Sequence, residues 1–237
     1  MRRLFARFAL LCLAPAAVAE PVTRPGFSFD APRGWIAVTP DRREMMEHAP
    51  TSVRQVLARI DLRQVEAFVV DPAEDEFHES VNVVTQPGEM PVTEYSRADL
   101  ARTLPEHYEN SGVSVQSMRV EIATLGKNRV LLAISDLRLS GTEVDLRQWQ
   151  VFVPGRGRTY TLTCTARKQD FAEREPIFQS VLESLTVEAP AGQGGILGGA
   201  ARGALFGGAA GAVAALAFAL WRWKKRTGDP VANPPGR

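Results

Sequence analysis

The chain has 237 residues, of which 45% are hydrophobic and 23% charged, and its formal net charge is +1. Residues 20–190 carry 19 Lys and Arg against 26 Asp and Glu, so this part is net −7. An acidic region argues against a nucleic-acid partner and against a domain that lies flat on anionic lipid, and its length favours one domain with its own core.

The N-terminus has the pattern of an export signal. Basic residues precede a short apolar run over residues 8–13, and Ala17-Val18-Ala19 has the small-x-small spacing that signal peptidase recognises. The apolar run is too short to span a bilayer. These features predict a signal peptide over residues 1–19 that is cleaved after Ala19.

Residues 20–188 predict an extracytoplasmic α+β domain, because strands and helices do not alternate as in repeated βαβ units. We expect a single twisted antiparallel sheet flanked by helices, plus one C-terminal transmembrane helix. Short turns containing glycine separate the last four strands, as in antiparallel hairpins. The expected strands are residues 27–29, 35–38, 65–70, 80–85, 113–122, 129–139, 143–153 and 159–166.

Three helical regions are predicted within this domain. The first is weak and runs from Thr39 to about residue 60. The second begins at Ser96, with Asp99 in a capping-box position, and ends at Gly112. The third follows Asp170 and places Pro176 near its first turn, where proline is tolerated.

The last predicted strand alternates between two faces. Tyr160, Leu162, Cys164 and Ala166 point one way, and the intervening threonines point the other way. Once the signal peptide is removed, Cys164 is the one cysteine left, so no intramolecular disulfide can form. We expect it to be a small buried apolar residue and not a reactive thiol. Trp35 and Trp149 are likewise expected to pack in the core or on the sheet.

Small residues recur every four positions near the C-terminus. On a helix they form one ridge without large side chains, along which membrane helices pack closely. A Gly- and Pro-rich tether over residues 189–198 leads into a predicted transmembrane helix over residues 199–223, within which residues 203–221 carry no charge. The ridge consists of Gly195, Gly199, Gly203, Gly207, Gly211 and Ala215.

A basic cluster follows this apolar segment, and basic flanks of membrane helices stay in the cytoplasm. With an exported N-terminus, the chain is predicted to cross the cell (inner) membrane once, leaving residues 224–237 as a disordered cytoplasmic tail. The expected partners are the membrane and a second helix, from another copy or from another membrane protein. The cytoplasmic anchor consists of Arg222, Lys224, Lys225 and Arg226.

The order of features over residues 26–188 resembles the PsbP/Mog/DcrB-like superfamily. The resemblance is carried by the start Phe27-x-Phe29-x-x-Pro32-x-Gly34-Trp35, the central helix, the four-strand meander and the closing amphipathic helix. It implies the superfamily's fold and a non-enzymatic role in binding partners or supporting membrane assemblies. No binding motif of a member matches here, so it implies no site residues.

The residues themselves identify no reaction, and we expect no cofactor and no metal. None of His48, His78 and His107 has a second histidine at metal-ligand spacing, and no nucleophile or phosphate-binding motif occurs. The sequence therefore predicts a non-enzymatic, membrane-tethered protein-binding or scaffold domain. Two alternatives stay open: a membrane-surface enzyme centred on His78 or His107, and a substrate of a C-terminal sorting system.

Overall fold

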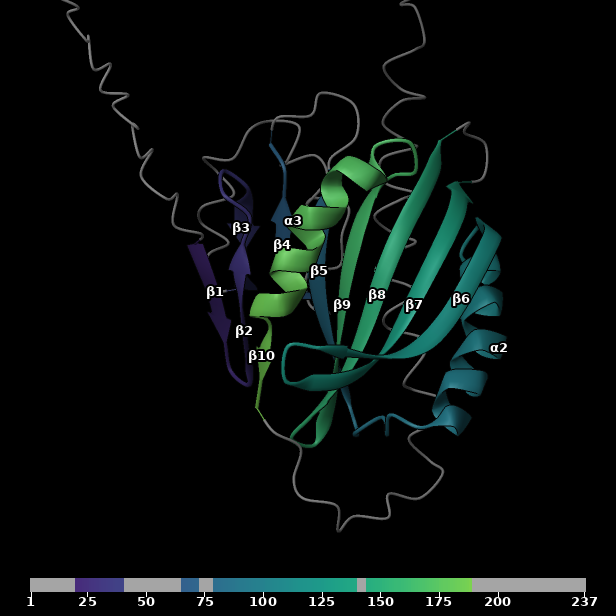
Figure 1. Ribbon diagram of the computed structural model, residues 1–237, viewed down its shortest axis with the longest axis horizontal. Coiled ribbons are helices and arrows are strands. Elements are labelled where there is room, and N and C mark those ends of the chain that lie inside the picture. The colour runs from purple at the N-terminus through teal and green to yellow at the C-terminus, as the bar shows by residue number, and fades with distance from the viewer. Residues whose placement is uncertain (1–19, 41–64, 73–78, 140–143, 189–237) are drawn as a thin grey trace, which may run out of the picture.

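The computed structural model describes residues 20–40, 65–72, 79–139 and 144–188 (Figure 1). The predicted signal peptide, residues 41–60 of the weak helical region, the tether, the transmembrane helix and the tail lie outside these residues, as do His48 and His78. In the described part of the chain, no helix is both long and apolar enough to cross a bilayer.

The described residues form the elements that the sequence pattern predicts, with strand ends that differ by a few positions. The strand at 65–70 is found as predicted, and an additional strand begins at Glu20. In chain order the elements are β1 (Glu20–Arg24), β2 (Phe27–Ala31), β3 (Ile36–Val38), β4 (Val65–Val70), β5 (Ser80–Pro87), α2 (Glu94–Asn110), β6 (Val113–Leu125), β7 (Asn128–Leu139), β8 (Asp145–Gly155), β9 (Arg158–Arg167), α3 (Phe171–Ser184) and β10 (Thr186–Val187).

The strands form two antiparallel sheets, so the α+β class is confirmed but the expectation of a single sheet is wrong. The large sheet has seven strands in the order β3-β4-β5-β9-β8-β7-β6, and the small sheet has the order β1-β2-β10. Phe27, at the start of β2, pairs with both Arg24 of β1 and Val187 of β10. The sequence pattern does not show this second sheet, because β10 has only two residues and lies after the last helix.

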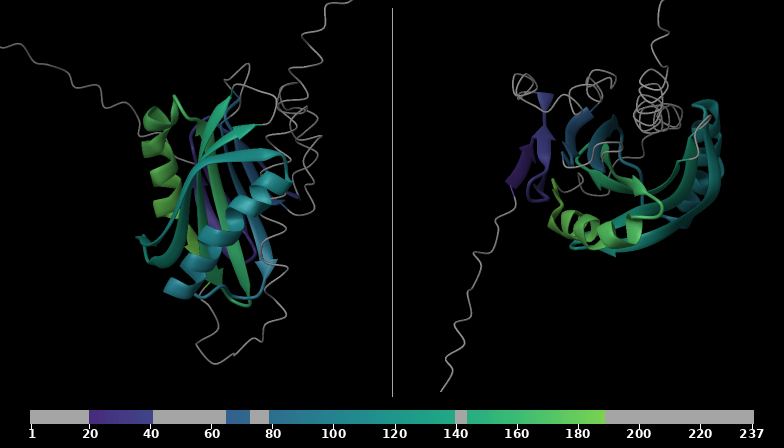
Figure 2. Two further views of the ribbon diagram at one scale, coloured as in Figure 1. Left: turned by 90° about the vertical axis from the view of Figure 1, so that its right-hand side faces the viewer. Right: turned by 90° about the horizontal axis from the view of Figure 1, so that it is seen from above.

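The two described helices lie on opposite faces of the large sheet (Figures 1 and 2). On one face α2 packs Leu100, Leu104 and Tyr108 against apolar residues of β6, β7 and β8. The other face is covered by α3 and the small sheet. There the ring of Trp35 packs edge-on against the ring of Phe178. The large sheet is therefore covered from both sides, as its central strands require.

Helix α2 begins two residues earlier than predicted. The side chain of Thr93 accepts a hydrogen bond from the backbone N–H of Ser96 at 3.2 Å, so Thr93 is the N-cap and Ser96 lies inside the first turn. Asp99, expected to complete a capping box, instead pairs with Arg102 at 2.7 Å. The predicted end is confirmed, since Gly112 follows the helix with a φ of +76°.

Helix α3 begins after Asp170, as predicted. Pro176 is not near the first turn but lies in the second, because the helix already starts at Phe171. The buried stripe of α3 consists of Phe171, Phe178, Val181 and Leu182.

Two alanine variants, one at Thr93 and one at Asp99, test which residue caps α2. We expect Thr93→Ala to lower the free energy of unfolding by about 1 kcal/mol, because one N–H at the start of α2 loses its acceptor. Asp99→Ala should change it by less than about 0.5 kcal/mol, since its ion pair with Arg102 is exposed. Urea unfolding of both variants checks this, and an equal loss in the two would contradict the assignment.

Candidate functional site

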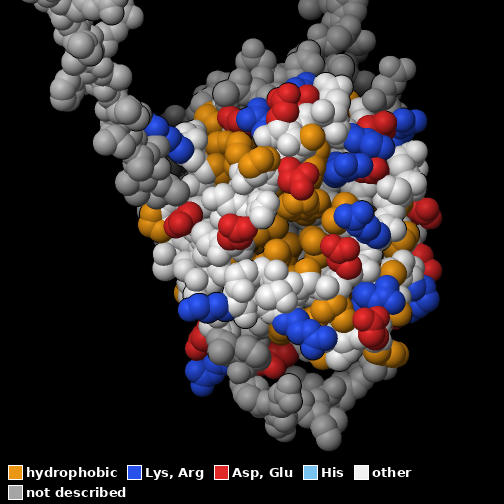
Figure 3. Space-filling view, viewed as in Figure 1, with side chains coloured by type: hydrophobic (Ala, Val, Ile, Leu, Met, Phe, Trp, Pro, Cys, Tyr) orange, Lys and Arg blue, Asp and Glu red, His pale blue; other side chains and the backbone are white. Residues whose placement is uncertain are grey.

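An open pocket of about 270 Å³ lies on the α3 face of the large sheet, beside the first turns of α3. Its apolar part consists of Ile134 from β7, Trp149 from β8 and Phe171 from α3, and the last two pack edge-on with ring centroids 5.3 Å apart. Figure 3 shows hydrophobic side chains gathered at the middle of this face among charged ones. We call this pocket the aromatic groove; its other lining residues are Ser117, Met118, Arg119, Asp136, Arg147 and Glu175.

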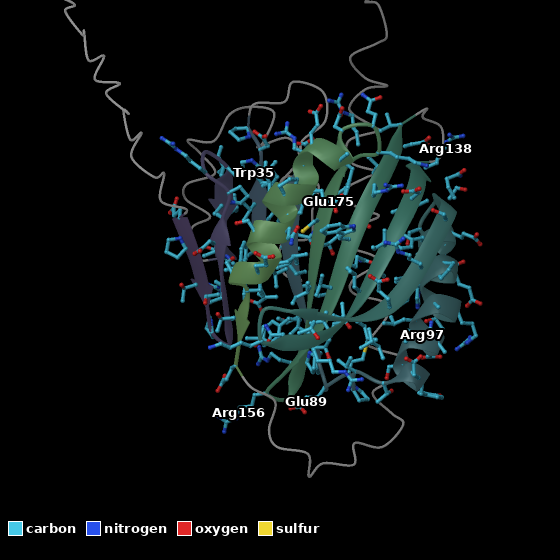
Figure 4. All side chains as sticks on the ribbon, in the orientation of Figure 1. Trp35, Glu89, Arg97, Arg138, Arg156 and Glu175 are labelled. Atoms are coloured by element: carbon cyan, nitrogen blue, oxygen red, sulfur yellow. The ribbon has the colours of Figure 1, made fainter. Side chains whose placement is uncertain are left out.

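Strand register places these side chains on one face. Trp149 of β8 pairs with Ile134 of β7. Two positions along the same face, Arg147 of β8 pairs with Asp136 of β7. An irregularity in β6 before Ser117 shifts the register, after which Ser117 lies opposite Asp136 and Arg119 opposite Ile134. Exposed polar side chains of the edge strand therefore border the aromatic floor. Glu175 projects from α3 on the other side of the groove (Figure 4).

Asp136 forms the strongest electrostatic contact in the groove. Arg147 donates two hydrogen bonds to its carboxylate, at 2.6 and 3.0 Å, and the ammonium of Lys168 lies 3.0 Å from it. The hydrogen bond from Arg147, followed by that from Lys168, lowers the pKa of Asp136 to about 2 against the opposing effect of burial. The guanidinium of Arg147 also lies over the ring of Phe171, 5.9 Å from its centroid. This cation–π contact joins the ion pair to the aromatic floor and holds both side chains in position.

Sequence reasoning missed this cluster, although a signal for it was present. The predicted hairpin between β7 and β8 places residues of opposite charge directly opposite each other, Arg138 with Asp145 and Asp136 with Arg147. Reading the register of the hairpin would have found both pairs.

The depressed pKa of Asp136 predicts a defined pH dependence of stability. Because the pKa is lower in the folded than in the unfolded chain, this pair stabilises the fold above about pH 4, and its contribution of about 2 kcal/mol is lost between about pH 4 and pH 2. In Asp136→Asn the free energy of unfolding should fall at neutral pH and its decline over this interval should be smaller. Urea unfolding as a function of pH measures both.

Asp145→Asn is the matched control, because Arg138 contacts Asp145 with the same two-bond geometry two register positions away. That pair is exposed, so its removal should change stability much less than removal of the Asp136 pair. Equal losses in the two variants would show that burial does not distinguish them.

The opposite face of the large sheet carries a row of buried neutral polar side chains, which we call the polar stripe. It crosses the central strands β5, β9, β8 and β7, where cross-strand partners such as Asn82, Thr163 and Gln150 lie in line. A side chain from α2, Tyr108, reaches the same row. The stripe consists of Ser80, Asn82, Gln86, Tyr108, Ser135, Gln148, Gln150, Thr159, Thr161, Thr163 and Thr165, all of which are buried.

Part of the polar stripe forms a hydrogen-bonded network. The hydroxyl of Tyr108 lies 2.7 Å from Oε1 of Gln148 and 2.8 Å from Oε1 of Gln150. Gln148 in turn donates to the hydroxyl of Thr165 at 2.9 Å. Burial raises the pKa of Tyr108, which keeps this hydroxyl a donor. At the end of the stripe Thr159 accepts from the backbone N–H of Met90.

Several members of the stripe, Gln150 of the network among them, have polar atoms without a hydrogen-bond partner in the part of the chain that the structure describes. A buried polar group without a partner destabilises a fold by about 1–3 kcal/mol, and whole domains are stable by only about 5–15 kcal/mol. A stripe with several such groups therefore lowers stability and suits contact with a polar partner or ordered water. The atoms are Ser80 Oγ, Asn82 Oδ1, Gln86 Oε1 and Nε2, Ser135 Oγ, Gln150 Nε2 and Thr161 Oγ1.

Two threonines of β9 test this reading of the stripe. We expect Thr161→Val to raise the free energy of unfolding by about 1 kcal/mol, because a methyl group replaces a hydroxyl that has no partner. Thr165→Val should lower it by a similar amount, because the side chain of Gln148 loses its acceptor. Thermal and urea unfolding measure both, and destabilisation by Thr161→Val would show that its hydroxyl is hydrogen-bonded in solution.

The structure places the remaining candidate residues of the domain. Cys164 is buried and free in the core facing α3, as predicted, and burial raises the pKa of its thiol. Trp35 is a core residue, as predicted, whereas Trp149 both packs on the sheet and lines the aromatic groove. His107 is half-buried on α2 and is not among the residues that line the groove.

Within residues 20–40, 65–72, 79–139 and 144–188, no three His, Cys, Asp or Glu side chains are grouped as a metal site would need. The small-residue ridge from Gly195 to Ala215, the basic anchor and the cleavage position Ala19 all lie outside the described residues. They stay predictions of the sequence.

Comparison with known proteins found similarity in structure alone. No family model and no curated protein matches the sequence. The chain is similar to the solution structure of cyanobacterial PsbP (CyanoP) from Synechocystis sp. PCC 6803, with a TM-score of 0.49 and 15% identity over 78% of this chain and 98% of that one.

Two further solved structures are similar over most of their own length. LpqN of Mycobacterium tuberculosis, which is involved in cell envelope biogenesis, gives a TM-score of 0.43 at 16% identity over 71% of this chain and 90% of that one. PA94 of Pseudomonas aeruginosa gives 0.37 at 20% identity over 50% and 78%. At these values the similarities show nothing about function.

Proposed function

We propose that this chain is a membrane-tethered, extracytoplasmic protein-binding or scaffold domain without enzymatic activity. The observation that carries the proposal is the aromatic groove, in which Trp149 and Phe171 form an apolar floor bordered by Arg119 and Glu175. Trp and Arg are enriched where protein partners bind most tightly, and an apolar centre with a polar rim is the usual anatomy of such sites. An inserted side chain of the partner would contact the floor.

The ionisable groups of the groove suit binding better than acid–base chemistry. A general acid or base works best with a pKa near the working pH, whereas the partners of Asp136 hold its pKa at about 2. The carboxylate stays charged and fixed by Arg147 and Lys168. Such a fixed pair positions the walls of a binding site. His107, named in the enzymatic alternative, belongs to α2 on the other face.

Sequence features at the two ends support the proposed location. The export signal ending at Ala19 and the basic cluster after residue 221 agree on a single-pass topology in the cell (inner) membrane, with the domain outside. The small-residue ridge, which includes Gly203 and Gly207, supports close packing against another helix. In this proposal the groove recruits a partner, and the ridge assembles the chain with itself or with another membrane protein.

Position-specific photo-crosslinking in native membranes tests both parts. A photoreactive residue at Ser117, on the edge of the groove, should give a protein adduct, and the same residue at exposed Tyr95 on α2 should not. Arg119→Glu should reduce the Ser117 adduct by about fivefold, because rim charges steer and hold a partner. Equal labelling from both positions, or none from Ser117, would contradict a partner in the groove.

The ridge is examined in the same membranes. Gly203→Leu with Gly207→Leu should abolish crosslinks between membrane helices, because leucine side chains prevent close approach of the backbones. The domain should remain folded, since the substitutions lie outside it. Helix crosslinks that persist in this variant would contradict an interface along the ridge.

A further inference from the structure

The point at which the chain leaves the domain is fixed by contacts from three turns. The backbone N–H of Glu188 donates to the carbonyl of Gly26 in the β1–β2 turn at 2.8 Å, and its carbonyl accepts from the N–H of Arg156 in the β8–β9 turn at 3.3 Å. Asn128 of the β6–β7 turn donates to the carbonyl of Leu185 at 3.1 Å. We call this region the exit end; it consists of residues 24–26, 125–129, 155–158 and 185–188.

The exit end presents exposed cations that have no carboxylate partner among the described residues: Lys127, Arg129 and Arg158. The carboxylates at or beside this end have partners that hold them in place, although a hydrogen bond from a neutral donor does not remove their charge. Glu188 pairs with Arg156 at 3.2 Å, and Glu89 accepts from the backbone N–H of Gly157 at 2.7 Å; Figure 4 labels Arg156 and Glu89.

Two further carboxylates near this end are also engaged. Glu66 lies 3.7 Å from Arg24, and Glu183 accepts from Gln179 at 2.8 Å. Arg24, Lys127, Arg129, Arg156 and Arg158 give five positive charges against four negative ones from Glu66, Glu89, Glu183 and Glu188, so the region is net +1, although residues 20–190 as a whole are acidic.

The sequence beyond Glu188 sets how far this end can move from a bilayer. Residues 189–198 are Gly-rich, and a flexible coil of that length has a typical end-to-end distance of about 18 Å. The uncharged stretch 203–221 follows soon after. A short tether gives its two ends a high effective concentration, so weak contacts suffice to orient the domain.

We infer that the exit end docks on the anionic lipid headgroups of the membrane that holds the chain, with Lys127, Arg129 and Arg158 facing the phosphates. This deepens the proposed function and rests on its membrane tether. The acidic domain does not lie flat; it stands on the end that carries these three cations. Each cation near an anionic surface changes the docked population by about fivefold, and the attraction falls off within about 10 Å, so docking weakens with salt.

The test uses the full chain reconstituted in bilayers of phosphatidylcholine with or without phosphatidylglycerol. A fluorophore is attached to a cysteine at Thr124 or at Ser114, which are both exposed and lie at opposite ends of β6, while Cys164 is buried and stays unlabelled. Lipids with a nitroxide headgroup quench the dye at short range. We expect several-fold stronger quenching at Thr124 than at Ser114 in the anionic bilayers, and a loss of this difference in high salt.

Charge reversal supplies the matched comparison. Lys127→Glu with Arg158→Glu should remove the difference in quenching. The control Arg33→Glu with Arg102→Glu changes the net charge by the same amount at exposed positions outside the exit end and the groove, and it should preserve the difference. Equal quenching at Thr124 and Ser114 in a chain that resists carbonate extraction overturns docking alone. A chain that carbonate releases from the bilayer overturns the tether and docking together.

Discussion

The ladder between β5 and β9 is the constraint on which the rest of the domain depends. β5 lies in the first half of the chain, and β9 is the last strand of the meander. They pair from Ser80 with Thr165 to Pro87 with Arg158. Without this ladder the β3-β4-β5 group and the β6-to-β9 meander would be separate sheets. Because its contacts are far apart in sequence, it closes a long loop, which makes it a late and costly step of folding.

This ladder also sets the chemistry of the two faces. Side chains alternate along β9, so Leu162 and Cys164 enter the core beneath α3, while the threonines between them enter the polar stripe. One face is thereby an ordinary packed core that supports the aromatic groove at its border. The other carries hydroxyl and amide groups, some of them hydrogen-bonded to one another and some without a partner among the described residues. Positions of the second kind are commonly retained because a site needs them.

The sequence predicts most of the fold, because local signals dominate in the meander and the helices. Turn glycines such as Gly126 and Gly157 have positive φ and lie in the predicted turns. The pairing of β2 with β10 could not be predicted, since it joins residues about 160 positions apart through two short strands. The groove could be predicted only in part: hairpin register gives the pair of Asp136 with Arg147, but the contact of Arg147 with Phe171 depends on where α3 lies on the sheet.

The attachment of β10 to β2 has a mechanical consequence. Any load pulled through residues 189–198 reaches the domain at Glu188 and is borne first by the two residue pairs of β10 and by the contacts of Glu188 with its neighbouring turns. These are few compared with the long ladders of the large sheet. Under tension the last residues should therefore peel away and lengthen the linker before the sheet yields, so that this short strand acts as a weak link that protects the rest of the molecule.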